Sequence, residues 1–372
     1  MSVHPKTAPS DGRVAAPHVT SSALPSPATT RLQKAILCLP RAATWQETAE
    51  KALHAGADLD ATMSSHGGRT LLIHACTHGP LSVVRWLLEQ GANPNTGTWS
   101  GGKPLMVAAE HGHAEAVRLL LERGADPNAV DKNGWNALLA AASADCTEAV
   151  RLLLEHGATP DAARPLGDTA LMLAAQYGTT QTMRLLLDHG ADPNATDHYG
   201  RTTLMRAVIQ GGSEKTVRLL IARKTSMEAR DKTGCTALAW AAWHGRIAIA
   251  TLLLAHGADP NAQNQDGETV LAMAARRTRP QALIPLFGPL FAAGADPSIT
   301  DSSGRTLPES FMRHWLNDLV QAMDIELARP ALAATRRRLL DRLTTEQRTL
   351  WLPRSCTAET TANLTKAWSR QP

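Results

Sequence analysis

Cysteine is scarce in this chain of 372 residues. Its five cysteines lie far apart and form no C-x-x-C pair, so neither a disulfide framework nor a cysteine zinc site is indicated. Charged residues make up 19% of the chain and hydrophobic residues 43%, which is too little charge and too much apolar surface for wholesale disorder. This composition predicts a folded protein of a reducing compartment, and we expect it to be cytoplasmic.

Long apolar runs are also missing. The longest one near the N-terminus, residues 35–39, is too short for a signal peptide. No stretch approaches the roughly 20 apolar residues that a membrane span needs. The sequence therefore predicts no membrane insertion and no export by the general secretory route.

Signatures of catalysis are absent as well. There is no G-x-S-x-G, no P-loop, no G-x-G-x-x-G after a strand and no cysteine beside an activating partner. The 14 histidines do not combine into the three or four converging ligands of a zinc site; His156, His189 and His256 instead recur in the last turn of predicted helices, where their charge suits the helix dipole. We expect no enzyme, no cofactor, no metal and no small-molecule substrate.

A repeat of about 33 residues is what the sequence does contain. The stretch LLLDHGADPNATDHYGRTTLM at residues 185–205 has close copies at residues 119–139 and 252–272. The glycine that ends each leucine-rich helix recurs every 33 to 37 residues, with Lys224 in place of one; these glycines are Gly56, Gly91, Gly124, Gly157, Gly190, Gly257 and Gly294. Such a period indicates a solenoid of stacked units.

Each unit is predicted to be a helix, a tight turn and a second helix, followed by a hairpin tip. In one unit Thr169 can cap the first helix, and the alanine pair that follows allows a second helix to pack closely. Gly190 can take the left-handed conformation that closes the second helix, and Pro193 prevents its continuation. The Asp and Gly of residues 197–200 suit a tight turn at the tip.

This pattern resembles the ankyrin repeat family over about residues 32–306. The family's T-P-L-H-x-A-A motif is matched by residues 103–109, 169–175, 236–242 and 269–275. The resemblance implies an all-α solenoid of about seven or eight repeats with a protein partner, whose identity the pattern does not reveal. The family's usual histidine is replaced here by Met106, Leu139, Met172, Met205, Ala239 and Ala272.

Three regions are predicted along the chain. Residues 1–29 form a Ser/Pro/Ala-rich leader that we expect to be disordered, residues 30–306 form the array, and residues 307–372 form a helical cap with a basic extension. Residues 331–372 carry eight Arg or Lys against three Asp or Glu, so the net charge of +4 resides in this tail. A short Arg run there, residues 336–338, has no accompanying recognition motif, and we expect no nucleic-acid partner.

Irregular residues interrupt the repeat at three places. Lys224 and Asp145 each stand where other units carry a glycine. Gly288 and Pro289 fall inside a predicted helix and are expected to shorten or kink it.

Large side chains that the solenoid does not need are the candidate partner-binding residues. By the resemblance they occupy tip and concave-surface positions, and Trp, Tyr and Arg often dominate binding energy. Trp240 is excluded, because its position is usually filled by a core apolar residue. The alternative is that some of these aromatics pack against neighbouring tips. The candidates are Trp99, Trp135, Tyr177, Tyr199, Arg201, Arg206, Trp243 and His244.

Two functions fit this sequence. The first is a scaffold that binds a partner protein through tips and inner helices. The second is a bacterial effector, delivered into a host cell by a specialised secretion system, whose array binds a host protein and whose tail recruits a second factor. A Ser-rich leader with one acidic residue, Asp11, and no apolar signal motivates the second hypothesis, and the use of far more Arg than Lys suggests a bacterial source.

Overall fold

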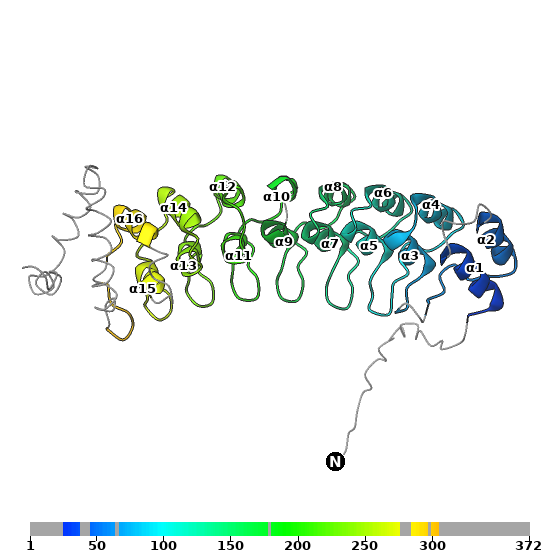
Figure 1. Cartoon of the computed structure of the whole chain (residues 1–372), viewed down its shortest axis with the longest axis horizontal. Helices are drawn as coiled ribbons and strands as arrows, with labels where there is room; N and C mark the ends of the chain where they lie inside the picture. The colour runs from blue at the N-terminus through cyan, green and yellow to red at the C-terminus, as the bar shows by residue number, and fades with distance from the viewer. Residues whose placement is uncertain are drawn as a thin grey trace, which may run out of the picture.

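The computed structural model describes residues 25–37, 45–63, 67–177, 180–275, 284–296 and 299–304. These residues form sixteen α-helices in two parallel rows, with a long loop below each unit (Figure 1). The first helices of the units are α1 (Pro27–Leu37), α3 (Leu71–His78), α5 (Pro104–Glu110), α7 (Ala137–Ser143), α9 (Ala170–Tyr177), α11 (Thr203–Gln210), α13 (Ala237–Trp243) and α15 (Val270–Ala275). The second helices are α2 (Trp45–His54), α4 (Leu81–Glu89), α6 (Ala114–Glu122), α8 (Thr147–Glu155), α10 (Thr180–Asp188), α12 (Glu214–Ala222), α14 (Ile247–Ala255) and α16 (Ile284–Ala292).

Most of the first helices begin where the sequence predicts, at a side chain that caps them. Thr169 Oγ1 accepts a hydrogen bond from the backbone N–H of Met172 at 3.3 Å, which satisfies one of the free donors at the start of α9. The same bond recurs in other units through Thr70, Asn136, Thr202, Thr236 and Thr269.

The second helices end at a residue in the left-handed region. All seven glycines predicted to close them have φ between 80° and 94°. Lys224 takes the same conformation with φ 58°, and Asp145 replaces a turn glycine with φ 56°. The irregular residues therefore keep the backbone path of the repeat, at the energetic cost that a side chain has in this region.

Lys224→Gly is expected to raise the free energy of unfolding by about 0.5–1 kcal/mol. Glycine removes the left-handed strain of about 1–2 kcal/mol, and its greater freedom in the unfolded chain cancels part of that gain. Urea unfolding followed by circular dichroism measures the change. The reciprocal change Gly190→Lys, at the equivalent position one unit earlier, should be destabilising; a loss of stability in Lys224→Gly would contradict this explanation.

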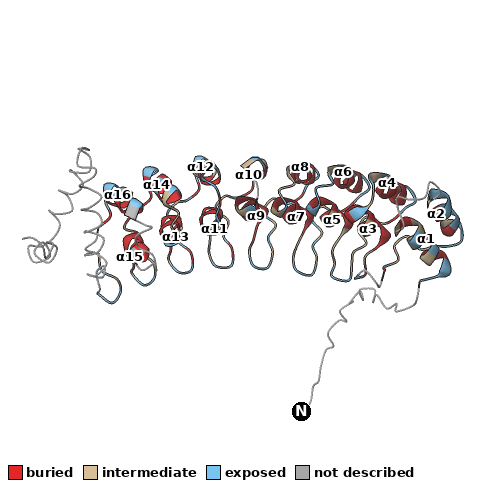
Figure 2. Ribbon diagram, viewed as in Figure 1, coloured by how far each residue is buried: buried red, intermediate tan, exposed pale blue. Residues whose placement is uncertain are grey.

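The core runs between the two helix rows along the whole array (Figure 2). First helices pack on first helices, and second helices pack on second helices, from one unit to the next. At least one alanine of the first helix is fully buried in each of six units, at Ala108, Ala141, Ala174, Ala207, Ala241 and Ala274. Since every unit makes the same two interfaces, the same small and large residues recur.

A ladder of side-chain hydrogen bonds also joins the units at the ends of their second helices. Asn128 Oδ1 accepts from the Thr159 backbone N–H at 2.8 Å, while its Nδ2 donates to the Gly157 carbonyl at 3.0 Å. Asp60, Asn95, Asp161, Asn194, Glu228 and Asn261 accept in the same way from the following unit. The turn that contains Lys224 keeps this ladder, because Ser226 donates to Asn194 and Glu228 accepts from Asp259.

Two features differ from the sequence prediction. The shortening predicted for α16 is wrong: the helix spans nine residues and continues through Gly288 and Pro289. Proline lacks the N–H that would donate to the carbonyl four residues earlier, but here that carbonyl belongs to Pro285 in the exposed first turn, so little is lost. The helix in return buries four large side chains, Leu286, Phe287, Leu290 and Phe291.

The other difference is at the start of the array. Helix α1 begins at Pro27, a favoured residue for a first helical position, so residues 27–29 belong to this helix and not to the leader. Residues 1–24 of the predicted leader and the predicted cap at residues 307–372 lie outside the described residues.

Candidate partner-binding surface

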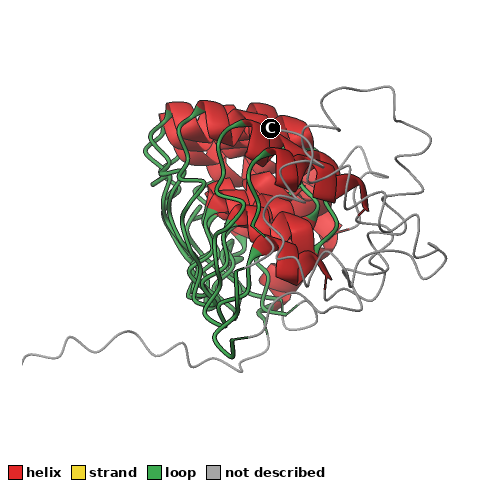
Figure 3. Cartoon of the chain, turned by 90° about the vertical axis from the view of Figure 1, so that its left-hand side faces the viewer, coloured by secondary structure: helices red, strands yellow, loops and turns green. Residues whose placement is uncertain are grey.

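The hairpin tips form one continuous edge of the molecule. All of the long loops project to the same side of the helices, as the end-on view shows (Figure 3). Backbone hydrogen bonds of 2.8–3.0 Å join tips of adjacent units: Lys132 donates to Ser100, His198 to Leu166, Lys232 to Tyr199, Gln265 to Thr233 and Ser302 to Asp266. Because the tips are bonded to each other, this edge is preorganised for binding.

An acidic side chain fixes the shape of the tips at residues 196–202 and 229–236. Asp197 Oδ1 accepts from the backbone N–H groups of Tyr199 and Arg201 at 2.8 and 2.9 Å. In the next unit Asp231 Oδ1 accepts from those of Thr233 and Cys235 at 2.8 and 3.0 Å. Both carboxylates are buried, and each still has a second oxygen directed away from the turn.

Arg206 on α11 connects two of these tips. Its guanidinium lies 3.0 Å from Asp168 Oδ1 and 3.6 Å from Asp197 Oδ2, and it also donates to Gln176 Oε1 at 3.4 Å. Arg164 shares Asp168 at 3.4 Å. With 13% of its side chain exposed, Arg206 has its charge balanced inside the array and serves mainly as a bridge.

Arg201 lies over two aromatic rings. Its guanidinium carbon is 4.8 Å from the ring centroid of Tyr199 and 5.3 Å from that of Trp240. The Trp240 indole N–H donates to Asp231 Oδ2 at 2.9 Å, which fixes the ring. Trp240 is half-buried and packs against the core, and it also forms part of this surface, because its indole reaches the buried carboxylate of the tip.

Some of the predicted aromatics do pack against neighbouring tips. Trp135 is half-buried, and the guanidinium carbon of Arg164 from the next tip lies 4.6 Å from its ring centroid. The indole of Trp99 covers Gly68 so closely that a Cβ there would collide with it, yet 56% of Trp99 remains exposed. Trp135 is thus mainly a packing residue, and Trp99 has one face available.

Besides Trp99, three predicted aromatic residues are exposed: Tyr177, Tyr199 and Trp243. Their exposed fractions are 61%, 51% and 39%. Tyr177 ends α9, Trp243 ends α13, and Tyr199 lies on the tip between them in sequence. His244 follows Trp243 and stacks on Trp240 with ring centroids 5.7 Å apart. We call Tyr177, Tyr199, Arg201, Trp240 and Trp243 the tip face.

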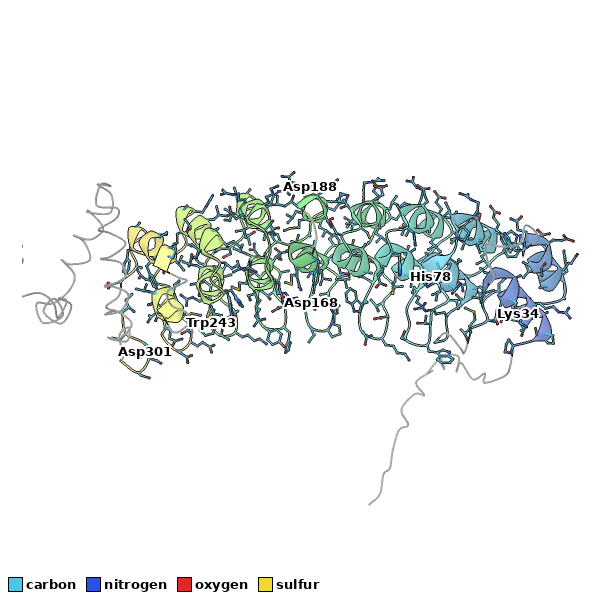
Figure 4. The ribbon with its side chains drawn as sticks, viewed as in Figure 1. Lys34, His78, Asp168, Asp188, Trp243 and Asp301 are labelled. Carbon is cyan, nitrogen blue, oxygen red and sulfur yellow. The ribbon has the colours of Figure 1, made fainter. Side chains whose placement is uncertain are left out.

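The tip face and the second helices lie on opposite sides of the array. Figure 4 shows Asp168 and Trp243 on the side of the tips and Asp188, at the end of α10, on the far side. All six large hydrophobic residues that are exposed in the described part of the chain lie on tips or at the ends of first helices; they are Trp99, Val130, Leu166, Tyr177, Tyr199 and Trp243. The exposed surface of the second helices carries ion pairs instead, such as Arg118 with Glu115 and Arg218 with Glu214.

The histidines and cysteines named here are accounted for by hydrogen bonding and burial within the fold. As predicted for the last helical turn, His156, His189 and His256 lie with Nδ1 2.8–2.9 Å from a carbonyl oxygen four residues earlier. Burial raises the pKa of Cys76 to about 12, and it also raises the pKa of Cys235, so neither is set up as a thiolate nucleophile. Within the ranges described, no three His, Cys, Asp or Glu side chains are grouped to hold a metal, and no helix has the length and apolar character of a membrane span.

Family models for ankyrin repeats match most of this chain. A model of three ankyrin copies matches residues 41–131, 123–197 and 190–264, and a second ankyrin model, for many copies, matches residues 244–286. The chain belongs to the ankyrin repeat family. The crystal structure of the ankyrin repeat domain of Bcl-3, titled a unique member of the IkappaB protein family, is similar to it at 31% sequence identity and a TM-score of 0.51. This similarity covers 56% of the present chain and 92% of the Bcl-3 chain. No curated protein matches the chain.

Family membership defines the general kind of molecule. The ankyrin array is a protein-interaction module, and its fold is typically a non-enzymatic one. Sequence reasoning missed Trp240 and the carboxylates Asp168, Asp197 and Asp231 as components of the surface. The signal available for two of them was the Asp that recurs three residues before a tip glycine, at Asp131, Asp197 and Asp231.

Proposed function

We propose that this ankyrin chain is a scaffold that binds a partner protein through its tip face. The observation that carries the proposal is the placement of every exposed large hydrophobic residue of the described chain on tips or first-helix ends. A soluble surface seldom gathers aromatics on one side unless they are used, and Trp and Tyr are the types that most often dominate interfaces. Around the tip face, Trp99, Arg206 and His244 would complete the contact, with Trp135 supporting it from below.

The rigidity of the tip row supports the same function. The backbone bonds between tips and the buried carboxylates hold Tyr199 in place before any partner arrives. Binding therefore orders few new groups, which removes a large entropic penalty. A partner that covers a standard interface of about 1,600 Å² would reach from the tips onto the ends of α9, α11 and α13.

The test is an affinity pull-down with mass spectrometry that compares the full chain with a Tyr177→Ala, Tyr199→Ala, Trp243→Ala variant. We expect at least a tenfold loss of captured partner, because three exposed aromatics of the interface are removed while buried contacts are kept. The matched control replaces three exposed arginines of the second helices, Arg85, Arg184 and Arg218, by alanine. Equal capture by both variants, each with unchanged helicity, would place the binding surface elsewhere.

A second candidate is an effector role in a host cell. It is favoured by the composition of residues 1–24, which carry one acidic residue, Asp11, among Ser, Pro and Ala. Residues 307–372, which we propose as a helical cap and basic extension, would then recruit a second factor. Performing the pull-down in lysates of both the source cell and a host cell, and testing translocation of a reporter fused to residues 1–50, separates this role from an internal one. Failure of translocation in every secretion system tried would remove it.

A further inference from the structure

Arg201 has unused hydrogen-bonding capacity at the centre of the tip face. Among the described residues its guanidinium donates no hydrogen bond, and its one ion pair, to Asp231 Oδ2, is 4.0 Å long. That oxygen already accepts from the Trp240 indole, and the other oxygen of Asp231 accepts from two backbone N–H groups and the Thr233 hydroxyl. The carboxylate holds Arg201 in place but leaves its donors available.

The neighbouring arginines differ from Arg201 in this respect. Arg206 and Arg164 have a carboxylate oxygen at 3.0 and 3.4 Å, and Arg230 donates to the Gln263 carbonyl. Nε of Arg201 is buried and has no hydrogen-bond acceptor, whereas 24% of the side chain is exposed. The exposed part therefore includes the terminal guanidinium nitrogens. A planar guanidinium that is fixed over two rings and open at its tip is shaped to receive a carboxylate in bidentate fashion.

Charge around Arg201 favours the same ligand. The four tips at residues 130–136, 163–169, 196–202 and 229–236, with Arg206, carry six basic and four acidic residues. Three of the acidic side chains, Asp168, Asp197 and Asp231, are buried, while Lys132, Arg230 and Lys232 are exposed. The charge presented to a partner is therefore positive, although the chain from residue 1 to residue 330 is nearly neutral.

We propose that the tip face binds an extended acidic segment of a partner protein, with one of its carboxylates held by Arg201 between Tyr199 and Trp240. The inference rests on the proposed scaffold function and specifies its partner. Two terminal segments of this chain do not have the composition of such a ligand: residues 1–24 contain one acidic residue, and residues 331–372 have a net charge of +5. Tyr177 and Trp243 supply apolar contact on either side of the charged centre.

The experiment selects random 16-residue peptides displayed on phage against the full chain. Enriched peptides should carry more Asp and Glu than Lys and Arg. For a synthetic copy of the best one, fluorescence anisotropy should show about tenfold weaker binding to Arg201→Gln, partial recovery in Arg201→Lys, and a change of less than twofold in Arg118→Gln. Arg118→Gln removes the same charge from the exposed surface of α6.

Several outcomes would overturn the inference. In the selection, they are the absence of any enrichment and the enrichment of neutral or basic peptides. In the binding measurements, they are an equal effect of Arg201→Gln and Arg118→Gln, and equal competition by a single-stranded DNA of matched charge, which would indicate a general polyanion surface. The two proposals can fail separately. If the triple aromatic variant loses the partner in the pull-down while Arg201→Gln retains it, the scaffold stands and the acidic ligand does not. Thermal unfolding of each variant confirms that it is folded.

Discussion

Replacing Asp231 by alanine is expected to lower the free energy of unfolding by about 3–5 kcal/mol. This carboxylate is buried and accepts hydrogen bonds from the backbone of its own tip and from the Trp240 indole. Its removal leaves those donors without an acceptor in a place that water reaches poorly, and it leaves Arg201 without its counter-charge. Urea unfolding monitored by circular dichroism and by tryptophan fluorescence measures the loss.

Two further variants separate the buried carboxylate from a general effect of charge. Asp231→Asn retains an acceptor for the tip backbone but turns an amide N–H₂ toward the Trp240 indole N–H, and we expect a smaller loss of about 1–3 kcal/mol. Asp266→Ala removes an exposed acidic side chain from the adjacent tip and should stay within about 0.5 kcal/mol of the parent. A loss in Asp231→Ala no larger than that in Asp266→Ala would show that the tips are held by other contacts.

The close approach of neighbouring tips predicts a second large effect, at Gly167. Gly167→Ala is expected to lower the free energy of unfolding by about 2–4 kcal/mol, from left-handed strain together with overpacking. Its φ is +81°, and a Cβ would lie 2.8 Å from Asp197 Cα and 2.8 Å from the His198 nitrogen. That backbone has little room to retreat, because His198 donates to the Leu166 carbonyl at 2.8 Å.

Gly124→Ala is the matched control for Gly167→Ala. Gly124 has φ +82°, but nothing lies within 4 Å of the Cβ that would be added. Its substitution carries the conformational penalty alone, about 1–2 kcal/mol. Chemical denaturation of the two variants side by side should show the larger loss at Gly167; equal losses would mean that contact between tips contributes little to stability.

The regular part of the structure was predictable from sequence because local chemistry repeats with the period. A threonine that caps, a glycine that closes and a leucine stripe each act within a few residues, so Thr169, Gly190 and their equivalents predict helix pairs directly. Lys224 and Asp145 were predicted only as interruptions of the repeat, and the structure shows that they take the positive φ of the glycines they replace.

The chemistry of the tip face was less predictable, since it depends on contacts between units. Arg206 lies 38 residues after Asp168 in sequence, and nothing in the spacing shows that its guanidinium reaches both Asp168 and Asp197. Trp240 and Trp135 illustrate the same limit. A repeat alignment gives the position of a residue in its unit, but how much of its side chain is exposed depends on the neighbouring unit that packs on it. Pro289 shows that burial of large side chains can override a local helix breaker.

The most direct test of the central claim is a hydrogen–deuterium exchange footprint of the full chain with a captured partner bound. Slower exchange is expected in the tips at residues 196–202 and 229–236 and around the C-terminal ends of α9 and α13, where the tip face lies, with α8, α10 and α12 unchanged. Protection confined to those second helices, with the tips exchanging as in the free chain, would contradict the assignment of this edge as the binding surface.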